Sequence, residues 1–281
     1  MDQGQTYVER APVPALADWV RTVWVQRIGA RPYLQRNLPT GGVELHCPIG
    51  GLPRLLGPLT AAAVQLVPAH TSVVGVRFWP GAAAALFGLP ARELVDVTVQ
   101  THELWGSAAE RLGELLADAP GPEAALGLLQ RYLLRRQARS EDPDPLVIEA
   151  VRRLMPWEPV DVSTLTMRLA ISASQLRRRF LATVGVGPKS LQRTLRFQGY
   201  LALVQAASTP GRPVAGVRLA DLAGEAGYAD QPHLSRECLR LTGLTPRELL
   251  SGGIERCRCE HDHAASYLPF LAGRARVPRS G

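Results

Sequence analysis

Residues 219–246 read LADLAGEAGYADQPHLSRECLRLTGLTP, and a related pattern lies 58 residues earlier in the chain. Four positions repeat at that offset: Leu176, Phe180, Gly185 and Pro188 recur as Leu234, Cys238, Gly243 and Pro246. Four matches at one offset, including a glycine and a proline, indicate a duplicated structural unit. An apolar segment of helical length precedes each copy. We therefore predict two similar helical units, at about 162–187 and 218–246.

The first copy carries a helix start signal. Residues 172–175 spell S-x-x-Q, the reciprocal cap that satisfies backbone N–H groups at a helix N-terminus. A helix is therefore predicted from Ala173, with Leu176, Phe180 and Val184 forming its buried stripe. The residues left outward near its start, where a recognition helix meets base edges, are Ser174, Gln175, Arg177 and Arg178.

The second copy predicts the same arrangement. Asp230 is the expected cap, and Leu234, Cys238 and Leu241 are expected to line the core. The outward positions are Gln231, His233, Ser235 and Arg236. An ordinary solvated helix face is the alternative interpretation, which the duplication and the charge of the segment make less favourable.

The charge of this region is one-sided. The whole chain has a net charge of +7, and residues 162–220 contain nine basic side chains and no acidic one. Such a stretch attracts polyanions, because neutralised phosphates release condensed counterions. Pro188 suits a first helical position, and a helix over 189–207 would be about 28 Å long, which would place two recognition helices roughly one DNA turn apart. The expected phosphate contacts are Arg179, Lys189, Arg193, Arg196 and Arg240.

On these motifs, residues 146–250 resemble the C-terminal DNA-binding domain of AraC/XylS-type transcription regulators. Their second unit typically reads "IA…GF.d.s.FsR.Fk…G.tP", and this chain departs from it at Cys238, where a large aromatic is usual, and at Pro232, often polar. Looser packing under the second recognition helix is the expected consequence of Cys238. The resemblance implies an activator, with base contacts from Ser174, Arg177, Arg178, Gln231, His233 and Arg236.

The first half of the chain has a different pattern. The polar, proline-punctuated stretch QARSEDPDP at 137–145 marks a domain boundary. Upstream of it we expect strands at 19–28, 42–49 and 71–78 and helices at 82–87, 104–116 and 123–136. The predicted fold is an α+β domain over 1–143, followed by an all-α double helix-turn-helix domain over 144–250.

LPTGGVEL at 38–45 and VGVRFWPGAA at 74–83 resemble the N-terminal domain of a subset of AraC-like regulators. That resemblance implies small-molecule sensing or dimerisation. Because aromatic walls with a few polar groups form ligand sites, the pocket candidates are Trp24, Glu44, His46, Arg77, Trp79 and Trp105. Core packing and capping are the alternative roles for the same residues.

Residues 251–281 are expected to form a mobile tail. They contain CRCEHDH, in which the zinc-compatible side chains are Cys257, Cys259, His261 and His263. Structural zinc sites usually separate two ligand pairs with a loop, so this spacing is atypical. An adventitious cluster and a metal-responsive site both stay open. Thiol sensing at Cys238 is a further alternative, against the simpler role of a small buried residue.

Other classes of protein fit less well. There is no Gly-rich phosphate loop, nucleophile elbow or carboxylate pair, and Cys47 and His46 would point to opposite faces of a strand. An enzyme and a cofactor are therefore not expected, nor are a membrane span or a secretory signal. The chain is predicted to be a cytoplasmic, sequence-specific transcription regulator. Its candidate partners are double-stranded DNA, RNA polymerase, a small-molecule effector and a second copy, and a protein-binding module is the rival interpretation.

Overall fold

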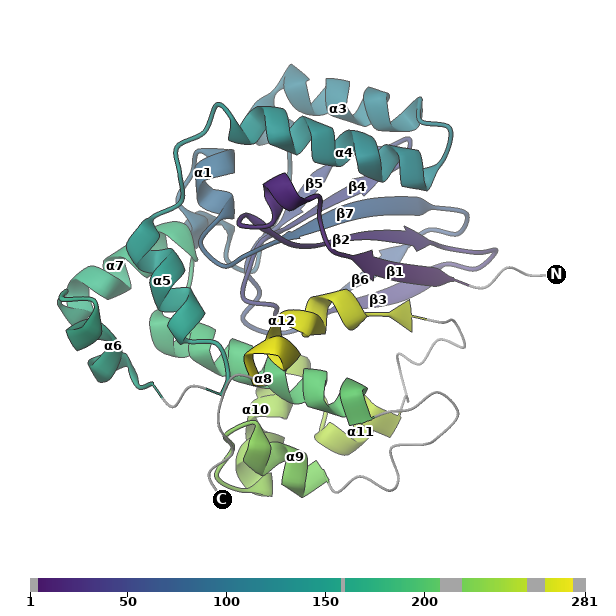
Figure 1. Ribbon diagram of the computed structural model, residues 1–281. Coiled ribbons are helices and arrows are strands. Elements are labelled where there is room, and N and C mark those ends of the chain that lie inside the picture. The colour runs from purple at the N-terminus through teal and green to yellow at the C-terminus, as the bar shows by residue number, and fades with distance from the viewer. Residues whose placement is uncertain (1–4, 158–159, 208–218, 252–260, 275–281) are drawn as a thin grey trace.

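The computed structural model describes residues 5–157, 160–207, 219–251 and 261–274 (Figure 1). In that part of the chain seven strands form one sheet in the order β8-β5-β4-β7-β2-β1-β9. The strands are β1 (Thr6–Arg10), β2 (Val20–Arg27), β4 (Glu44–Pro48), β5 (Arg54–Leu56), β7 (Ser72–Phe78), β8 (Thr98–Gln100) and β9 (His261–Asp262). Neighbouring strands are antiparallel except β1 and β9, which are parallel. A second, two-stranded sheet joins β3 (Tyr33–Asn37) to β6 (Ala63–Val67).

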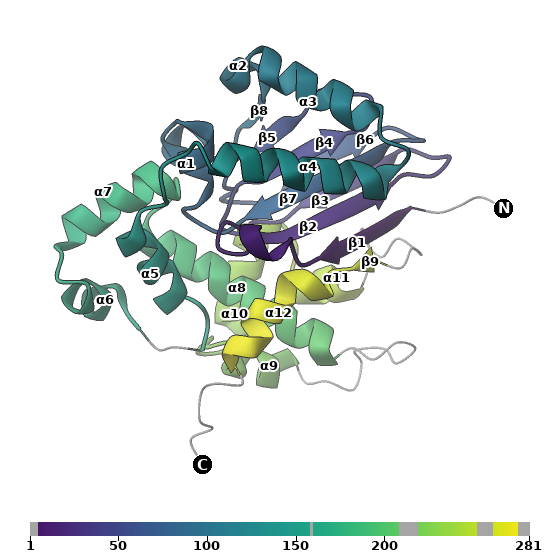
Figure 2. The same cartoon turned by 45° about the horizontal axis from the view of Figure 1, so that its top comes forward.

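The alternation of side chains along β7 divides the sheet into two faces. Val74, Val76 and Phe78 point into the main core, whereas Val73 belongs to a smaller cluster on the opposite face. The helices α3 (Ser107–Ala117) and α4 (Pro122–Gln137) cover the first face (Figure 2). Shorter elements complete this half of the chain: η1 (Pro14–Leu16), α1 (Ala83–Phe87), η2 (Ala91–Leu94) and α2 (His102–Trp105).

The second half is helical, as predicted. Its helices are α5 (Pro145–Arg153), α6 (Val162–Arg168), α7 (Ala173–Thr183), α8 (Pro188–Ala207), α9 (Leu219–Glu225), α10 (Gln231–Thr242) and α11 (Pro246–Ser251). The first helix-turn-helix unit is α6 with α7, the second is α9 with α10, and α8 connects them. The predicted α+β domain followed by an all-α domain is confirmed.

The predicted helix starts and core positions of both units are confirmed. Ser172 and Gln175 form a capping box at α7, and the Asp230 side chain accepts a hydrogen bond from the His233 N–H at α10. Leu176 and Phe180 lie in the core of the first unit, and Leu234 and Cys238 lie in the core of the second. The duplicated pattern therefore encodes duplicated packing.

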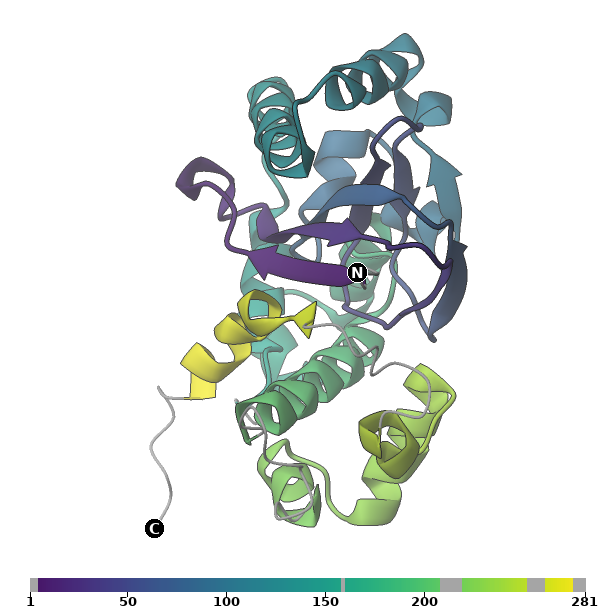
Figure 3. The ribbon, with the colours of Figure 1, turned by 90° about the vertical axis from the view of Figure 1, so that its right-hand side faces the viewer.

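The segment after the second unit differs from the expected mobile tail. His261–Asp262 is strand β9, and α12 (Ala264–Arg274) lies between the sheet and α8 (Figures 1 and 3). Phe270 of α12 is fully buried in the first unit's core. Burial of this ring offsets the conformational entropy that the segment loses when it is ordered. The expectation of a mobile tail is therefore wrong for 261–274.

Among the described residues, no helix is both long enough and apolar enough to cross a bilayer.

Candidate nucleic-acid interface and interdomain pocket

The predicted base-contacting side chains of α7 lie at the surface. Ser174, Arg177 and Arg178 are exposed near the N-terminal end of the helix. Gln175 is also exposed, but its side-chain oxygen accepts the backbone N–H of Ser172 at 3.0 Å. Three of these four residues can therefore meet a ligand without disturbing the cap, and the fourth also serves the cap.

The second recognition helix, α10, presents fewer unoccupied groups. Gln231 and Arg236 are exposed. His233 is half-buried: its Nδ1 accepts the Ala229 N–H at 3.4 Å, and its ring packs edge-on against Tyr228 with centroids 5.2 Å apart. His233 therefore supports the turn before α10, a role that the motif did not predict.

The predicted phosphate contacts divide into two groups. Lys189 and Arg240 are exposed in the described structure, at the start of α8 and near the end of α10. Arg179 forms an ion pair with Asp144, and the Arg196 guanidinium lies over the Tyr228 ring, 5.9 Å from its centroid.

Arg193 belongs to the second group, because its Nε donates to Glu237 Oε2 at 2.7 Å. This ion pair joins α8 to the second recognition helix. The sequence predicted a phosphate contact for Arg193 and gave no sign of this bond to Glu237.

Cys238 is fully buried beside aromatic rings. Tyr200 and Tyr228 lie in the same core with centroids 6.3 Å apart, and the Cys238 Sγ is 3.8 Å from the Thr242 hydroxyl. Two aromatic rings, one from α8 and one from the turn before α10, therefore share the core of the second unit with Cys238. Burial raises the pKa of the Cys238 thiol to about 11, which disfavours the thiolate that a reactive sensor needs.

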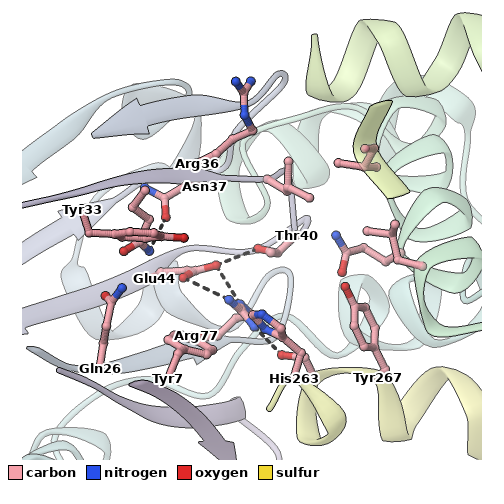
Figure 4. Close-up of a pocket in the computed structure, with 16 residues that line it drawn as sticks. Tyr7, Gln26, Tyr33, Arg36, Asn37, Thr40, Glu44, Arg77, His263 and Tyr267 are labelled. Atoms are coloured by element: carbon pink, nitrogen blue, oxygen red, sulfur yellow. Dashed lines mark hydrogen bonds and ion pairs between the residues drawn. The ribbon is translucent and has the colours of Figure 1, made fainter. Parts of the chain in front are cut away.

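A pocket of about 270 Å³ lies between the two halves of the chain (Figure 4). One wall is the second face of the main sheet with the β3–β6 sheet, and the other is formed by α8, α11 and α12. Its lining is largely polar and aromatic, and comprises Tyr7, Gln26, Tyr33, Gln35, Arg36, Asn37, Leu38, Thr40, Glu44, Arg77, Gln198, Leu201, Leu249, His263, Ser266 and Tyr267.

A row of buried charges crosses the floor of this pocket. Arg77 Nε donates to Glu44 Oε1 at 2.7 Å, and its Nη1 donates to Glu9 Oε1 at 2.8 Å. Burial alone would raise the pKa of Glu44, but the charge of Arg77 and a hydrogen bond from His46 bring it down to about 2. The pKa of Glu9 also lies well below its ordinary value, since Arg77 outweighs the effect of burial. Both carboxylates are ionised at neutral pH and already paired.

Gln26 offers the pocket an unoccupied amide. Its side chain lines the pocket and is only 2% exposed, yet it makes no hydrogen bond to another described residue. A buried carboxamide without a partner is costly unless a ligand or water satisfies it. Gln26 is thus a lining residue whose amide an occupant of the pocket can bond.

The six predicted pocket residues have three different fates. Glu44 and Arg77 line the pocket. His46 and Trp24 lie directly behind it: His46 is 3.3 Å from Glu44, and the Trp24 ring is 5.5 Å from that of Tyr7. Their position behind the lining fits a supporting role.

The other two predicted residues are on the opposite face. Trp79 donates its indole N–H to the Ala17 carbonyl at 3.0 Å. Trp105 stacks on Phe87 at 4.8 Å. For this pair the pocket prediction was wrong, and core packing is their role.

Sequence reasoning missed most of the lining. Tyr7 precedes the first predicted strand, Gln198 lies on the connecting helix, and Tyr267 lies in the expected tail. No local sequence pattern marks these residues, because they lie on three segments that are distant in sequence and meet only in the fold.

Most of the predicted metal ligands lie outside the described residues. This holds for Cys257, Cys259 and the side chain of His261. His263 is described: its Nδ1 is 3.4 Å from Glu9 Oε1, and its ring packs on Tyr7. Within the described ranges, no group of three or more His, Cys, Asp or Glu is placed to hold a metal ion.

Comparison with known proteins assigns the two halves separately. Residues 165–252 match a family described as a helix-turn-helix domain, and residues 8–100 match a domain of unknown function, DUF6597. No curated protein matches the chain. Among solved structures, an apo form of ToxT from Vibrio cholerae shares 12% identity at a TM-score of 0.45, covering 82% of this chain and 96% of that one.

An unsaturated fatty acid-bound ToxT from Vibrio cholerae also matches, at 12% identity and a TM-score of 0.43, over 89% of this chain and 96% of that one. These scores are too low for any conclusion about this chain's ligand.

Residues 165–252 therefore form a helix-turn-helix domain, and with the motifs of 219–247 it is of the AraC type. The class of protein is a DNA-binding transcription regulator. The preceding domain, which contains the DUF6597 match, has mixed strand and helix content.

Proposed function

We propose that the protein is a sequence-specific regulator that reads two successive major-groove segments, one with α7 and one with α10. The observation that carries the proposal is the exposure of Arg177, Arg178 and Arg236 on two similarly capped helices. Arginine can bind guanine in a bidentate manner, which gives base specificity. By the AraC resemblance we further propose that it activates transcription with RNA polymerase.

Selection of binding sites from a random duplex pool tests DNA reading. On the selected site, Arg178→Ala and Arg236→Ala should each cost about 1–3 kcal/mol and relax preference at particular bases. Arg111→Ala is the matched control, because Arg111 is exposed on α3, which packs in the main sheet core and away from both recognition helices. Equal losses on selected and random duplexes would contradict base reading by these arginines.

Lys189→Ala tests the phosphate contacts separately. It should weaken binding to every duplex and reduce the salt dependence by about one unit of slope, since one phosphate contact is lost. An unchanged salt slope would remove Lys189 from the interface.

We also propose that the interdomain pocket binds a small polar effector. Arg77 is already paired with Glu9 and Glu44, so its charge is neutralised before any ligand binds, whereas Gln26 offers an amide donor and acceptor. Tyr7 and Tyr33 add aromatic walls.

Thermal melts with sugars, nucleosides, amino acids and long-chain carboxylates test this class. A polar ligand at 100 times its Kd should stabilise the protein by about 2.7 kcal/mol. Gln26→Leu should remove most of that shift, whereas Gln100→Leu, at an exposed position of β8 outside the pocket lining, should not. Stabilisation by long-chain carboxylates alone would contradict the proposal.

A further inference from the structure

The segment His261–Arg274, which we call the clasp, is attached to the first half of the chain at its start. Strand β9 pairs in parallel with β1 at Tyr7 and Val8. The Ser266 backbone N–H donates to Glu9 Oε2 at 3.0 Å, and the Ser266 hydroxyl accepts a hydrogen bond from Arg77. This end of the clasp is therefore bonded to the charge row on the floor of the pocket.

The other end of the clasp is attached to the helix-turn-helix units. Phe270 is fully buried in the first unit's core, and its carbonyl accepts the Trp157 indole N–H at 2.6 Å. Arg274 forms an ion pair with Glu225 at the end of α9, in the second unit. One helix of three turns thus contacts the sheet domain and both DNA-reading units.

Tyr267 lies where these attachments meet. It lines the pocket across from Tyr33 and Asn37 (Figure 4). The same side chain packs against the cores of both helix-turn-helix units. An occupant that moves the Tyr267 ring must therefore change the packing of both cores, because close-packed interiors leave little room for independent adjustment.

We propose that a ligand bound in the pocket changes the placement of both helix-turn-helix units at once, through the clasp. Tyr267 is the positioning residue. This deepens the effector site of the proposed function, and rests on it. A ligand shifts an equilibrium only by its different affinity for two arrangements. Tyr267 supplies that difference, since it is pocket wall and core residue together, and packed interfaces respond by discrete shifts.

The test measures the distance between the two units in the full chain and needs no effector. Spin labels are placed on cysteines at Met167 of α6 and Leu239 of α10, which are 73% and 53% exposed. Cys257 and Cys259 are replaced by serine, and the buried Cys47 and Cys238 are kept. Asn37→Trp fills the pocket and stands in for an occupant, with Gln26→Phe as a second filling variant.

Both filling variants should shift the distance distribution by more than its width in the unfilled protein. Tyr267→Ala should abolish that shift, and Tyr267→Leu replaces it if the alanine variant does not fold. Leu268→Ala is the matched control, because Leu268 lies on the same helix but is 59% exposed, and it should leave the shift intact.

An unmoved distribution in folded, pocket-filled protein would overturn the proposal, as would an equal shift with and without Tyr267. Site selection from random duplexes keeps this separate from the proposed function. A protein that selects a DNA site but shows no shift refutes the clasp alone. One that shows the shift but selects no site refutes the DNA-reading function alone.

Discussion

The two helix-turn-helix units share a pattern but are held in place differently. The first packs against the sheet domain: a Cβ on Gly185, just after α7, would lie 2.7 Å from the Ala91 carbonyl oxygen of η2. The second contacts that domain through a hydrogen bond from Arg36 to the Thr242 carbonyl at 2.9 Å, at the end of α10, and through Leu38, which packs on its core. Packing fixes one arrangement, whereas side-chain hydrogen bonds can exchange partners. The second unit is therefore the one whose placement can respond more readily.

Removing the central aromatic of the first unit should have the largest effect. Phe180 is fully buried, so Phe180→Ala should lower the free energy of unfolding by about 3–5 kcal/mol. Cys238→Ala at the equivalent position removes a single sulfur atom and should cost well under half as much. Urea denaturation of both variants measures the difference. Equal losses would erase the distinction between the two cores.

Restoring the usual aromatic in the second unit should be unfavourable. Tyr200 and Tyr228 already occupy the core beside Cys238, so Cys238→Phe should overpack it and cost about 1–3 kcal/mol. The same denaturation experiment gives the sign. A stabilised Cys238→Phe protein would mean that the rings leave a cavity, as the sequence alone suggested.

Removing either helix cap should have an intermediate effect. Ser172→Ala removes the bond from the Gln175 N–H to the Ser172 side chain and leaves the bond from the Ser172 N–H to the Gln175 side chain. Asp230→Ala removes the side-chain cap of α10. Each should cost about 0.5–2 kcal/mol. In each variant, DNA binding should lose base preference mainly in the half of the site that the uncapped helix reads. A larger loss in binding by α7 after Asp230→Ala would contradict this independence.

The turns before the recognition helices give the smallest expected effect. Ala170 has a φ of 52°, and Gly227 at the equivalent turn has a φ of 79°. Since glycine adopts positive φ without steric cost, Ala170→Gly should stabilise the first unit by up to about 1 kcal/mol and Gly227→Ala should destabilise the second similarly. Melting temperatures moving in the same direction would show that something other than the backbone angle dominates.

The sequence predicted the second half of the chain well because its signals are local. The capping box at Ser172, the four-residue spacing from Leu176 to Phe180 and the proline at 188 each act within two helical turns. The strands at 20–27, 44–48 and 72–78 were also predicted, from β-branched alternation. Strands β1, β5 and β8 were not predicted, because they are short or polar. The predicted helix at 104–116 is interrupted at Gly106, which has a φ of 53°.

The pocket was harder to predict because its residues are distant in sequence. Arg77 and Glu44 were found as polar groups within apolar strands, but their partner Glu9 lies on a strand that no pattern indicated. Trp79 and Trp105 have the same composition signal as Trp24 and differ only in which sheet face they occupy. Trp24 lies on β2, Trp79 follows β7 and Trp105 ends α2, so the core in which each ring packs is set by tertiary contacts.

The burial of Phe270 bears on how the protein can be divided for experiments. A fragment that stops where the recognised helix-turn-helix match ends, at residue 252, would lack the ring that fills the first unit's interior and the carbonyl that receives the Trp157 indole. Such a fragment would present an apolar hollow to water and would be prone to self-association. Poor solubility or weak DNA binding of that fragment would then result from the absence of Phe270. It would say nothing against DNA recognition by the intact chain.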